Sequence, residues 1–291
     1  MAFITFRAEN RVSYGVLRSD GVYDLGCRLG AVLPDLKSFL CARGLGILGA
    51  VPPATVTDYS DSEFSYLPVI PNPSKILCVG LNYEDHRRET GRPVAKHPAI
   101  FTRFADTLIG QNAAIVLPRN STSLDWEGEL AVVIGKTAFR VSEEDALTFV
   151  AGYSVFNDAT IRDWQHHTHQ FTPGKNFPGT GAFGPALLSP EEAGALADKR
   201  IETRVNDVVM QSAKLGDMIF SVSQIISYLS GFTQLAPGDV IATGTPGGVG
   251  FKRDPQVFMR QGNRVDVMVE GIGTLSNVID SEAPSPNHVR H

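Results

Sequence analysis

The stretch LDWEGELAVVIG, residues 124–135, combines three carboxylates with a run of apolar residues. A short apolar run of this kind, rich in β-branched residues, predicts a buried β-strand that begins near Glu129. Successive side chains of a strand point to opposite faces, so residues two apart share a face. Glu127 and Glu129 are therefore expected to point the same way, with Asp125 on the same side.

Carboxylates that share one face of a strand repel one another unless a cation lies between them or one of them takes up a proton. A divalent metal meets this need, and oxygen ligands suit Mg²⁺, Mn²⁺ or Ca²⁺ better than zinc. Asp158 follows the apolar run Gly152–Asn157 and offers a further ligand. An acidic run at a strand edge can also be a solvated face that prevents edge pairing, so the spacing leaves both interpretations open.

Working outward from this stretch, strand-like runs dominate the chain, and they do not alternate regularly with helices. This disfavours a doubly wound sheet and predicts an α+β, mostly β fold built on a mixed β-roll or barrel. Helices are expected after three start signals, Ser142, Ser189 and Ser221. The expected strands, with a helix-like stretch at Asp35–Arg43 that ends at Gly44, are Phe3–Arg7, Arg11–Arg18, Lys75–Val79, Ala99–Phe104, Ala114–Leu117, Glu129–Ile134, Gly152–Asn157, Arg200–Val205, Val208–Gln211, Val240–Thr243 and Arg264–Glu270.

The chain is expected to divide at a proline-rich segment, residues 68–73. Each proline lacks an N–H donor and cannot sit in a central strand, so we place a linker there. This gives a small β-rich N-terminal domain at 1–70, a larger domain at 71–280 and a flexible tail at 281–291.

Composition excludes several classes of protein. With 31 acidic against 26 basic residues the net charge is -5, and the absence of a Lys/Arg-rich run argues against nucleic acid as a partner. The sequence shows neither a signal peptide pattern nor a long apolar segment, which predicts a cytoplasmic protein without a membrane partner. The cysteines Cys27, Cys41 and Cys78 form neither a disulfide framework nor a zinc pair, and Cys78 is expected to be a buried, inert thiol.

Three further segments carry polar side chains or exposed backbone donors. Helical spacing puts His86 and Glu89 on one face, an arrangement that suits a general base but also occurs as a purely structural pair. The imidazoles at 166, 167 and 169 do not match a zinc-binding helix pair, and their segment is expected to be a polar loop. The glycine-rich stretch 243–250 lacks the lysine of a phosphate-binding loop, so we expect a tight turn whose exposed N–H groups could bind a substrate carboxylate or a phosphate.

Five motifs together resemble the fumarylacetoacetate hydrolase superfamily, over roughly residues 74–279, and in particular its acylpyruvase and 2-hydroxyhepta-2,4-diene-1,7-dioate isomerase-like branch. The resemblance implies a mixed β-roll that is usually a homodimer. The motifs, in the family's order, are CVGLNYEDHRRE (78–89), LDWEGELAVVIG (124–135), SVFNDATIRDWQ (154–165), GKNF (174–177) and LAPGDVIATGTPGGVG (235–250).

The resemblance also assigns ligands for the metal. It implies that Glu127, Glu129 and Asp158 hold Mg²⁺ or Mn²⁺, and that Lys175 stabilises an enolate or a carboxylate. The segment 175–185 departs from the pattern K-S-F-D-T-F-x-P-x-G-P of many members. This departure leaves the substrate specificity open.

The remaining implied roles concern catalysis and substrate binding. His86 and Glu89 match a water-activating pair on a mobile lid, and the positions that contact substrate are Arg162, Gln165 and Thr245. These assignments predict hydrolytic cleavage of a C–C bond in a small 2,4-dioxo acid of the acylpyruvate type, giving pyruvate and a carboxylic acid. Isomerisation of a 2-hydroxy-diene dioate, decarboxylation of oxaloacetate and non-catalytic binding of an acid are the alternatives.

Overall fold

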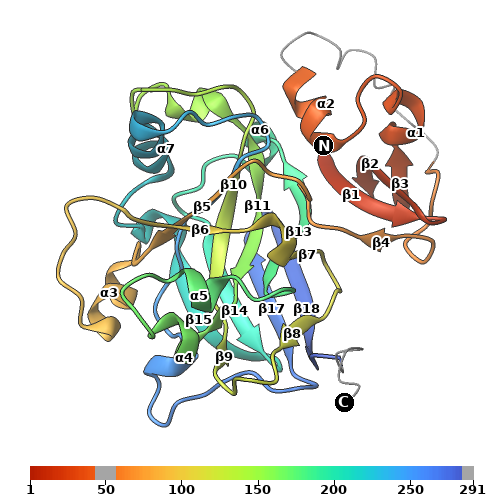
Figure 1. Cartoon of the computed structure of the whole chain (residues 1–291). Coiled ribbons are helices and arrows are strands. Elements are labelled where there is room, and N and C mark those ends of the chain that lie inside the picture. The colour runs from red at the N-terminus through yellow and green to blue at the C-terminus, as the bar shows by residue number, and fades with distance from the viewer. Residues whose placement is uncertain (43–56, 284–291) are drawn as a thin grey trace, which may run out of the picture.

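A computed structural model describes residues 1–42 and 57–283 of this protein (Figure 1). The predicted helix end at Gly44 and residues 284–291 of the predicted tail lie outside the described residues. The mostly β, α+β fold class is confirmed, with the strands in several sheets. In the described part of the chain, no helix has the length and apolar character needed to cross a membrane. The cytoplasmic location and the homodimer stay predictions.

The N-terminal segment forms an antiparallel meander, and its first two strands lie at the two predicted ranges. β1 joins this meander to the rest of the protein, because Ala2 and Phe3 pair with Leu188 and Leu187 of β13. The domain boundary at residue 70 stays a prediction. The elements of the segment are β1 (Ala2–Ala8), β2 (Arg11–Arg18), β3 (Gly21–Asp24), α1 (Leu25–Leu29), α2 (Leu36–Ala42) and β4 (Ser65–Tyr66).

The larger sheet runs in the order β3-β2-β1-β13-β11-β10-β16-β5-β6. Its centre is fully buried: every residue of β10 and β11 is inaccessible or nearly so. The strands after the N-terminal segment are β5 (Ile76–Gly80), β6 (Ala99–Arg103), β7 (Leu108–Ile109), β10 (Gly128–Ile134), β11 (Val150–Asp158), β13 (Gly181–Leu188) and β16 (Val240–Ala242).

A five-stranded sheet in the order β15-β14-β17-β18-β8 packs against the larger one through a shared apolar core (Figure 1). A separate pair, β9 with β12, carries residues of the candidate site. The bounds are β8 (Ile115–Leu117), β9 (Leu124–Asp125), β12 (Thr160–Ile161), β14 (Arg200–Val205), β15 (Val208–Lys214), β17 (Arg264–Val269) and β18 (Gly273–Ser281).

Each predicted strand coincides with an observed one. The sequence did not predict the long strands β13 and β18, nor the short strands β3, β4, β7, β9 and β12. The sequence of β13, GAFGPALL, contains two glycines and a proline, which are turn signals in a local reading. β18 extends to Ser281, so the predicted tail begins inside a strand. Pairing with neighbours far away in the sequence overrides the local preference in both.

Helices are short and lie around the sheets. Ser189 and Ser221 cap α6 and α7 as predicted, each accepting the N–H three residues on. The prediction after Ser142 is only partly right, because the segment forms a turn and a 3₁₀ helix instead of an α-helix. The helices beyond residue 70 are α3 (Glu84–Thr90), η3 (Ala105–Thr107), η4 (Ala146–Phe149), α4 (Arg162–Gln165), α5 (Thr172–Lys175), α6 (Pro190–Ala193), η5 (Leu215–Asp217), α7 (Val222–Phe232) and η6 (Gly250–Lys252).

Candidate active site

Three buried carboxylates meet where β10 and β11 lie side by side. Antiparallel pairing sets Gly128 opposite Asn157, which brings the start of one strand to the end of the other. One carboxylate oxygen from each of Glu127, Glu129 and Asp158 lies within 4.8 Å of the others. The acidic triad predicted from the sequence is therefore assembled, although its two halves are some 30 residues apart in the chain.

Asp125 does not join this triad, contrary to the shared face expected for it. β9 ends at Asp125 and β10 begins at Gly128, so the alternation of a single strand does not run through both. Asp125 accepts hydrogen bonds from the Nε of Arg162 (2.8 Å) and from the N–H groups of Gly250 (2.8 Å) and Phe251 (3.0 Å). It anchors a loop and an arginine of the site instead.

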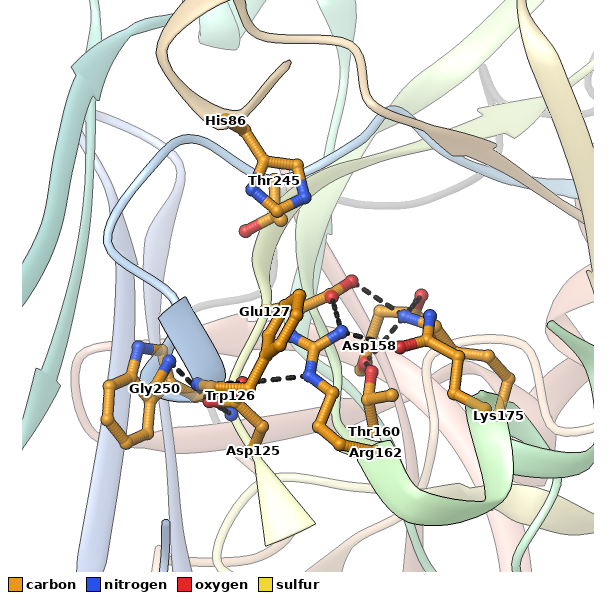
Figure 2. A network of polar contacts seen from close by, with 12 residues as sticks. His86, Asp125, Trp126, Glu127, Asp158, Thr160, Arg162, Lys175, Thr245 and Gly250 are labelled. Carbon is orange, nitrogen blue, oxygen red and sulfur yellow. Dashed lines mark hydrogen bonds and ion pairs between the residues drawn. The ribbon is translucent and has the colours of Figure 1, made fainter. Parts of the chain in front are cut away.

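Three cations form ion pairs with two of the three carboxylates, Glu127 and Asp158. Figure 2 shows two of these cations, Lys175 and Arg162, beside the carboxylates. The Nζ of Lys175 lies 2.6 Å from Glu127 Oε2 and 2.5 Å from Asp158 Oδ2. The Nη1 of Arg162 lies 2.7 Å from Glu127 Oε1, and the Nε of Arg103 pairs with Oδ1 of Asp158, the oxygen that Lys175 does not contact. All of these side chains are buried, so the pairs are shielded from water.

Sequence reasoning missed Arg103. Its guanidinium is fully buried and also donates to the backbone carbonyl of Ala159. The available signal was a lone basic residue in the apolar run Ala99–Phe104, because a buried charge requires a partner.

Glu129 differs from its two neighbours in charge compensation. In the described ranges 1–42 and 57–283, no lysine, arginine or histidine forms an ion pair with it, and its Oε2 accepts only the N–H of Gly244 (2.8 Å). Burial, and then the charges of Asp158 and Glu127, raise the pKa of Glu129 well above 4.5. Burial opposes ionisation of Glu127 too, but Lys175 and Arg162 outweigh it and lower its pKa to about 2.

This arrangement fits a divalent cation. Three hard oxygen donors converge, and one of them is a buried carboxylate that lacks a basic partner in the described part of the chain. Burial lowers the pKa of Lys175, but the charges of Asp158 and Glu127 more than compensate, so the lysine stays charged. Lys175, Arg162 and Arg103 do not pair with Glu129, so its repulsion with Glu127 and Asp158 is left without compensation. A cation held by all three carboxylates would remove this repulsion.

The glycine-rich loop 243–250 supports the site, but with a different role from the one expected. Three of its N–H groups are not available to a ligand, because they donate to carboxylates of the protein. Gly244 donates to Glu129, Gly248 to Glu89 (2.9 Å) and Gly250 to Asp125. The prediction of a substrate-binding turn is therefore wrong for these three donors, whose acceptors are distant in sequence and could not be read from it.

One cavity is lined by His86, Glu127, Lys175 and Thr245, and the structure shows what holds Thr245 there. The contact of Thr245 with substrate stays a prediction. The Thr245 hydroxyl donates to the carbonyl of Gly128 (2.9 Å) and accepts from the Nε2 of Gln211 (2.8 Å). The Oε1 of Gln211 in turn accepts the N–H of Gly128 (3.1 Å). Gln211, which sequence reasoning missed, therefore ties the loop to the start of β10, the strand that carries Glu129.

His86 and Glu89 make the contact predicted from their helical spacing. The Nδ1 of His86 lies 2.7 Å from Glu89 Oε1 on α3, and the second oxygen of Glu89 is fixed by Gly248. Figure 2 shows the imidazole above the carboxylate of Glu127, and both line one cavity. Because a carboxylate only accepts, Nδ1 is the donor in this contact. Nε2 forms no hydrogen bond with a described residue.

The polar segment after β12 is helical at its start, where a loop was expected. On α4, Arg162 and Gln165 are joined by a 2.9 Å hydrogen bond and line the cavity, and their contact with substrate stays a prediction. Of the three histidines that follow, His166 also lines the cavity, whereas His167 packs on the ring of Trp164 at 5.0 Å. His166 and His167 have different surroundings because they follow the end of α4 at Gln165, which the sequence pattern did not predict.

Cys78 is fully buried, as predicted. Burial, with the charges of Asp158 and Glu129, raises the pKa of its thiol well above 9.0. A neutral thiol of this kind is unreactive.

Gly128, between the two glutamates, allows the two sheets to approach each other. A Cβ there would lie 2.2 Å from the Oγ1 of Thr203 and 2.9 Å from Val267, both on strands that cannot easily move. We expect Gly128→Ala to lower the free energy of unfolding by about 1–3 kcal/mol, as overpacking of a core does. Chemical denaturation would measure it.

Gly231→Ala is the matched control for this change. Gly231 lies in α7 with nothing within 4 Å of a Cβ, so alanine there should stabilise by roughly 0.5–1 kcal/mol. Equal stability of the two variants would contradict the packing argument.

Comparison with known proteins supplies independent information. Residues 75–280 match the family model described as fumarylacetoacetate (FAA) hydrolase C-terminal. The mitochondrial oxaloacetate tautomerase FAHD2A of Bos taurus is 39% identical over 89% of this chain and 84% of that protein. The oxaloacetate tautomerase YisK of Bacillus subtilis is 44% identical over 76% of this chain and 75% of that protein.

Among solved structures, maleylpyruvate hydrolase from Sphingobium sp. SYK-6, in complex with manganese(II) and pyruvate, superimposes with a TM-score of 0.79. It is 25% identical, and the match covers 97% of this chain and 100% of that one.

Proposed function

This chain belongs to the fumarylacetoacetate hydrolase family, and from that premise we propose that it is a divalent-metal-dependent enzyme that acts through the enol of a small 2-oxo acid. The observation that carries the proposal is the convergence of Glu127, Glu129, Lys175 and His86 on one cavity. Enolisation needs carboxylates that can hold a metal ion, a fixed positive charge near the oxygen that becomes negative, and an imidazole that can transfer a proton.

Glu127, Glu129 and Asp158 would hold Mg²⁺ or Mn²⁺. A bound divalent cation supplies Lewis acidity that polarises the 2-oxo group and favours negative charge on its oxygen. The pyruvate and manganese of the hydrolase structure belong to that protein, but they support the same class of ligand here.

Lys175 and Arg162 would position the substrate. The ammonium of Lys175, charged and buried, adds fixed positive charge beside the reacting oxygen. The Nη2 of Arg162 is buried and forms no hydrogen bond with other described residues, although the rest of its guanidinium is bound to Asp125, Glu127 and Gln165. That donor is therefore left for a substrate carboxylate.

His86 would move the proton. In the enol-to-keto direction one proton leaves the enol oxygen and another is added at C3, so the reaction is an isomerisation with no co-reactant. Glu89 fixes the imidazole through Nδ1, which leaves Nε2 to exchange the proton with the substrate. The N–H of Gly248 holds Glu89 in turn.

Tautomerisation of oxaloacetate is the reaction that we propose first, because relatives at 39% and 44% identity are named for it. Hydrolysis of an acylpyruvate, predicted from the sequence, is the second candidate. The His86–Glu89 contact supports it, since a carboxylate-bound imidazole can equally activate a water.

A substrate panel tests the proposal. Oxaloacetate tautomerisation is followed by ultraviolet absorbance, and pyruvate release is measured from acylpyruvates and oxaloacetate, each with Mg²⁺, Mn²⁺ and EDTA. A 2-hydroxy-diene dioate completes the panel. Metal-dependent tautomerisation alone supports the first candidate, and pyruvate from acylpyruvates alone supports the second. Full activity in EDTA would contradict the metal-dependent enzyme.

Replacing His86 with alanine should lower the tautomerisation rate by about 10²–10⁴-fold, the usual contribution of a positioned acid or base. Calorimetric Mg²⁺ affinity should change little, because His86 is not one of the three carboxylate ligands.

His167→Ala is the control, since His167 packs on Trp164 and does not line the cavity. If His86→Ala kept the wild-type rate, the proton-transfer role would be wrong. Loss of acylpyruvate hydrolysis with retained tautomerisation would assign the imidazole to water activation only.

A further inference from the structure

We propose that Arg92, His166 and Lys252 form a second carboxylate-binding subsite, which makes the substrate a dicarboxylic 2-oxo acid. The inference rests on the proposed function, because it concerns the end of the substrate that the triad and Lys175 do not hold. All three residues line the same cavity as Glu127 and Glu129. They come from three separate segments, the chain after α3, the end of α4 and η6.

The ring of Phe251 organises this end of the cavity. The His166 ring lies 5.5 Å from it, the Nζ of Lys252 lies 5.1 Å from its centre, and the guanidinium of Arg162 lies 4.2 Å from its centre. Phe251 is itself fixed, since its N–H donates to Asp125. Basic side chains are therefore collected around one aromatic platform, next to the arginine that contacts the triad.

Charge compensation differs among the basic residues that line the cavity. Lys175 and Arg162 each form ion pairs with buried carboxylates. The side chains of Arg92 and Lys252 form no ion pair or hydrogen bond with any residue in the ranges 1–42 and 57–283, and Lys252 contacts only the ring of Phe251. The cavity wall therefore carries two positive charges that no carboxylate of the described residues compensates.

The neighbouring positive charges also act on His166. Burial lowers the pKa of His166, and Arg162, Lys252 and Arg92 lower it further. Basic groups on a surface usually keep apart or take acidic partners. Their convergence on a cavity wall without such partners favours an anionic ligand, and a carboxylate is the anion that a 2-oxo acid can carry at its other end.

The subsite predicts selectivity that can be measured. Oxaloacetate and 2-oxobutanoate both have four carbons and the same 2-oxo carboxylate, and they differ only in a terminal carboxylate in place of a methyl group. Binding of each to the Mg²⁺-loaded protein by calorimetry compares the subsite directly, without turnover as the readout. We expect oxaloacetate to bind more tightly, and the difference to shrink as ionic strength rises.

Lys252→Met and Arg92→Met remove the charges one at a time from two different segments. Each should weaken oxaloacetate binding about tenfold, whereas the affinity for 2-oxobutanoate should change less than about twofold. Lys136→Met, at an exposed lysine that does not line the cavity, is the control and should alter neither affinity.

The outcomes separate this inference from the function on which it rests. Equal weakening of both acids in the variants, or no weakening of either, would overturn the subsite while leaving the enzyme assignment intact. Wild-type protein that binds neither acid with Mg²⁺ present would overturn the proposed function, and the subsite with it.

Discussion

Glu129→Gln is expected to abolish divalent-metal binding and to lower turnover of a 2-oxo acid by on the order of 10³-fold or more. Loss of a residue behind a ligand costs roughly 10–100-fold in metal affinity or activity, so loss of a ligand should cost more. Glutamine keeps the size of the side chain and can still accept the N–H of Gly244. Calorimetric titration with Mg²⁺ and Mn²⁺, together with the rate on the best substrate, would measure both effects.

The same substitution should stabilise the metal-free protein, by about 1–3 kcal/mol at neutral pH. The pKa of Glu129 is raised in the folded state, so the folded protein binds more protons than the unfolded chain above pH 4.5. Wild-type stability therefore falls as the pH rises through this range, whereas the variant lacks the titrating group. The difference between the two should vanish near pH 4 and grow toward neutrality.

Denaturation of both proteins in EDTA, from pH 4 to pH 8, tests this, and Glu144→Gln at an exposed site is the control. Mg²⁺ should raise the melting temperature of wild type and of Glu144→Gln but not of Glu129→Gln. A metal-induced shift that survives in Glu129→Gln would remove that residue from the ligand set.

Lys175→Met should reduce turnover by about 10²–10³-fold while leaving metal binding intact. The Nζ lies within 2.6 Å of both Glu127 and Asp158, and it is the fixed charge proposed to act on the reacting oxygen. Removing it takes one positive charge away from the triad, so Mg²⁺ affinity should be equal or higher. Comparing kcat with the calorimetric Kd separates the two effects.

Stability gives a second readout for this variant. Removing one partner of a buried pair leaves uncompensated carboxylate charge, which typically costs about 3–5 kcal/mol. Arg162 still pairs with Glu127 and Arg103 with Asp158, so the loss should fall toward the lower end and Mg²⁺ should recover part of it. Lys136→Met serves as the surface control. Wild-type turnover in Lys175→Met, or loss of metal binding, would contradict the proposed role.

The site residues that the sequence predicted are those that follow from short-range pattern and from the family motifs. Glu129 lies at the start of one apolar strand with Glu127 just before it, and Asp158 ends another, so these positions limit where the three carboxylates can point. His86 and Glu89 are three residues apart on a helix, and that spacing alone brings their side chains together. The strands predicted by apolar runs were confirmed for the same reason.

Only the tertiary structure decided how the charges of the site are compensated. Arg103 is 55 residues from Asp158, and Gly244 is 115 residues from Glu129. The partner of a buried carboxylate is chosen by which strands become neighbours, and periodicity carries no information about that choice.

Because periodicity does not say which segments become neighbours, Asp125 was wrongly placed in the acidic cluster and β13 was missed. Asp125 took its donors from Arg162 and Gly250, on segments far along the chain, and β13 was formed by pairing with β1 and β11 despite its glycines and proline. The sequence by itself determined the mostly β class, the acidic triad and the His86–Glu89 pair, because local geometry and motif order specify them. Ion pairs, loop donors and the placement of the unpaired Arg92 and Lys252 in one cavity wall depend on contacts between distant segments, which only folding establishes.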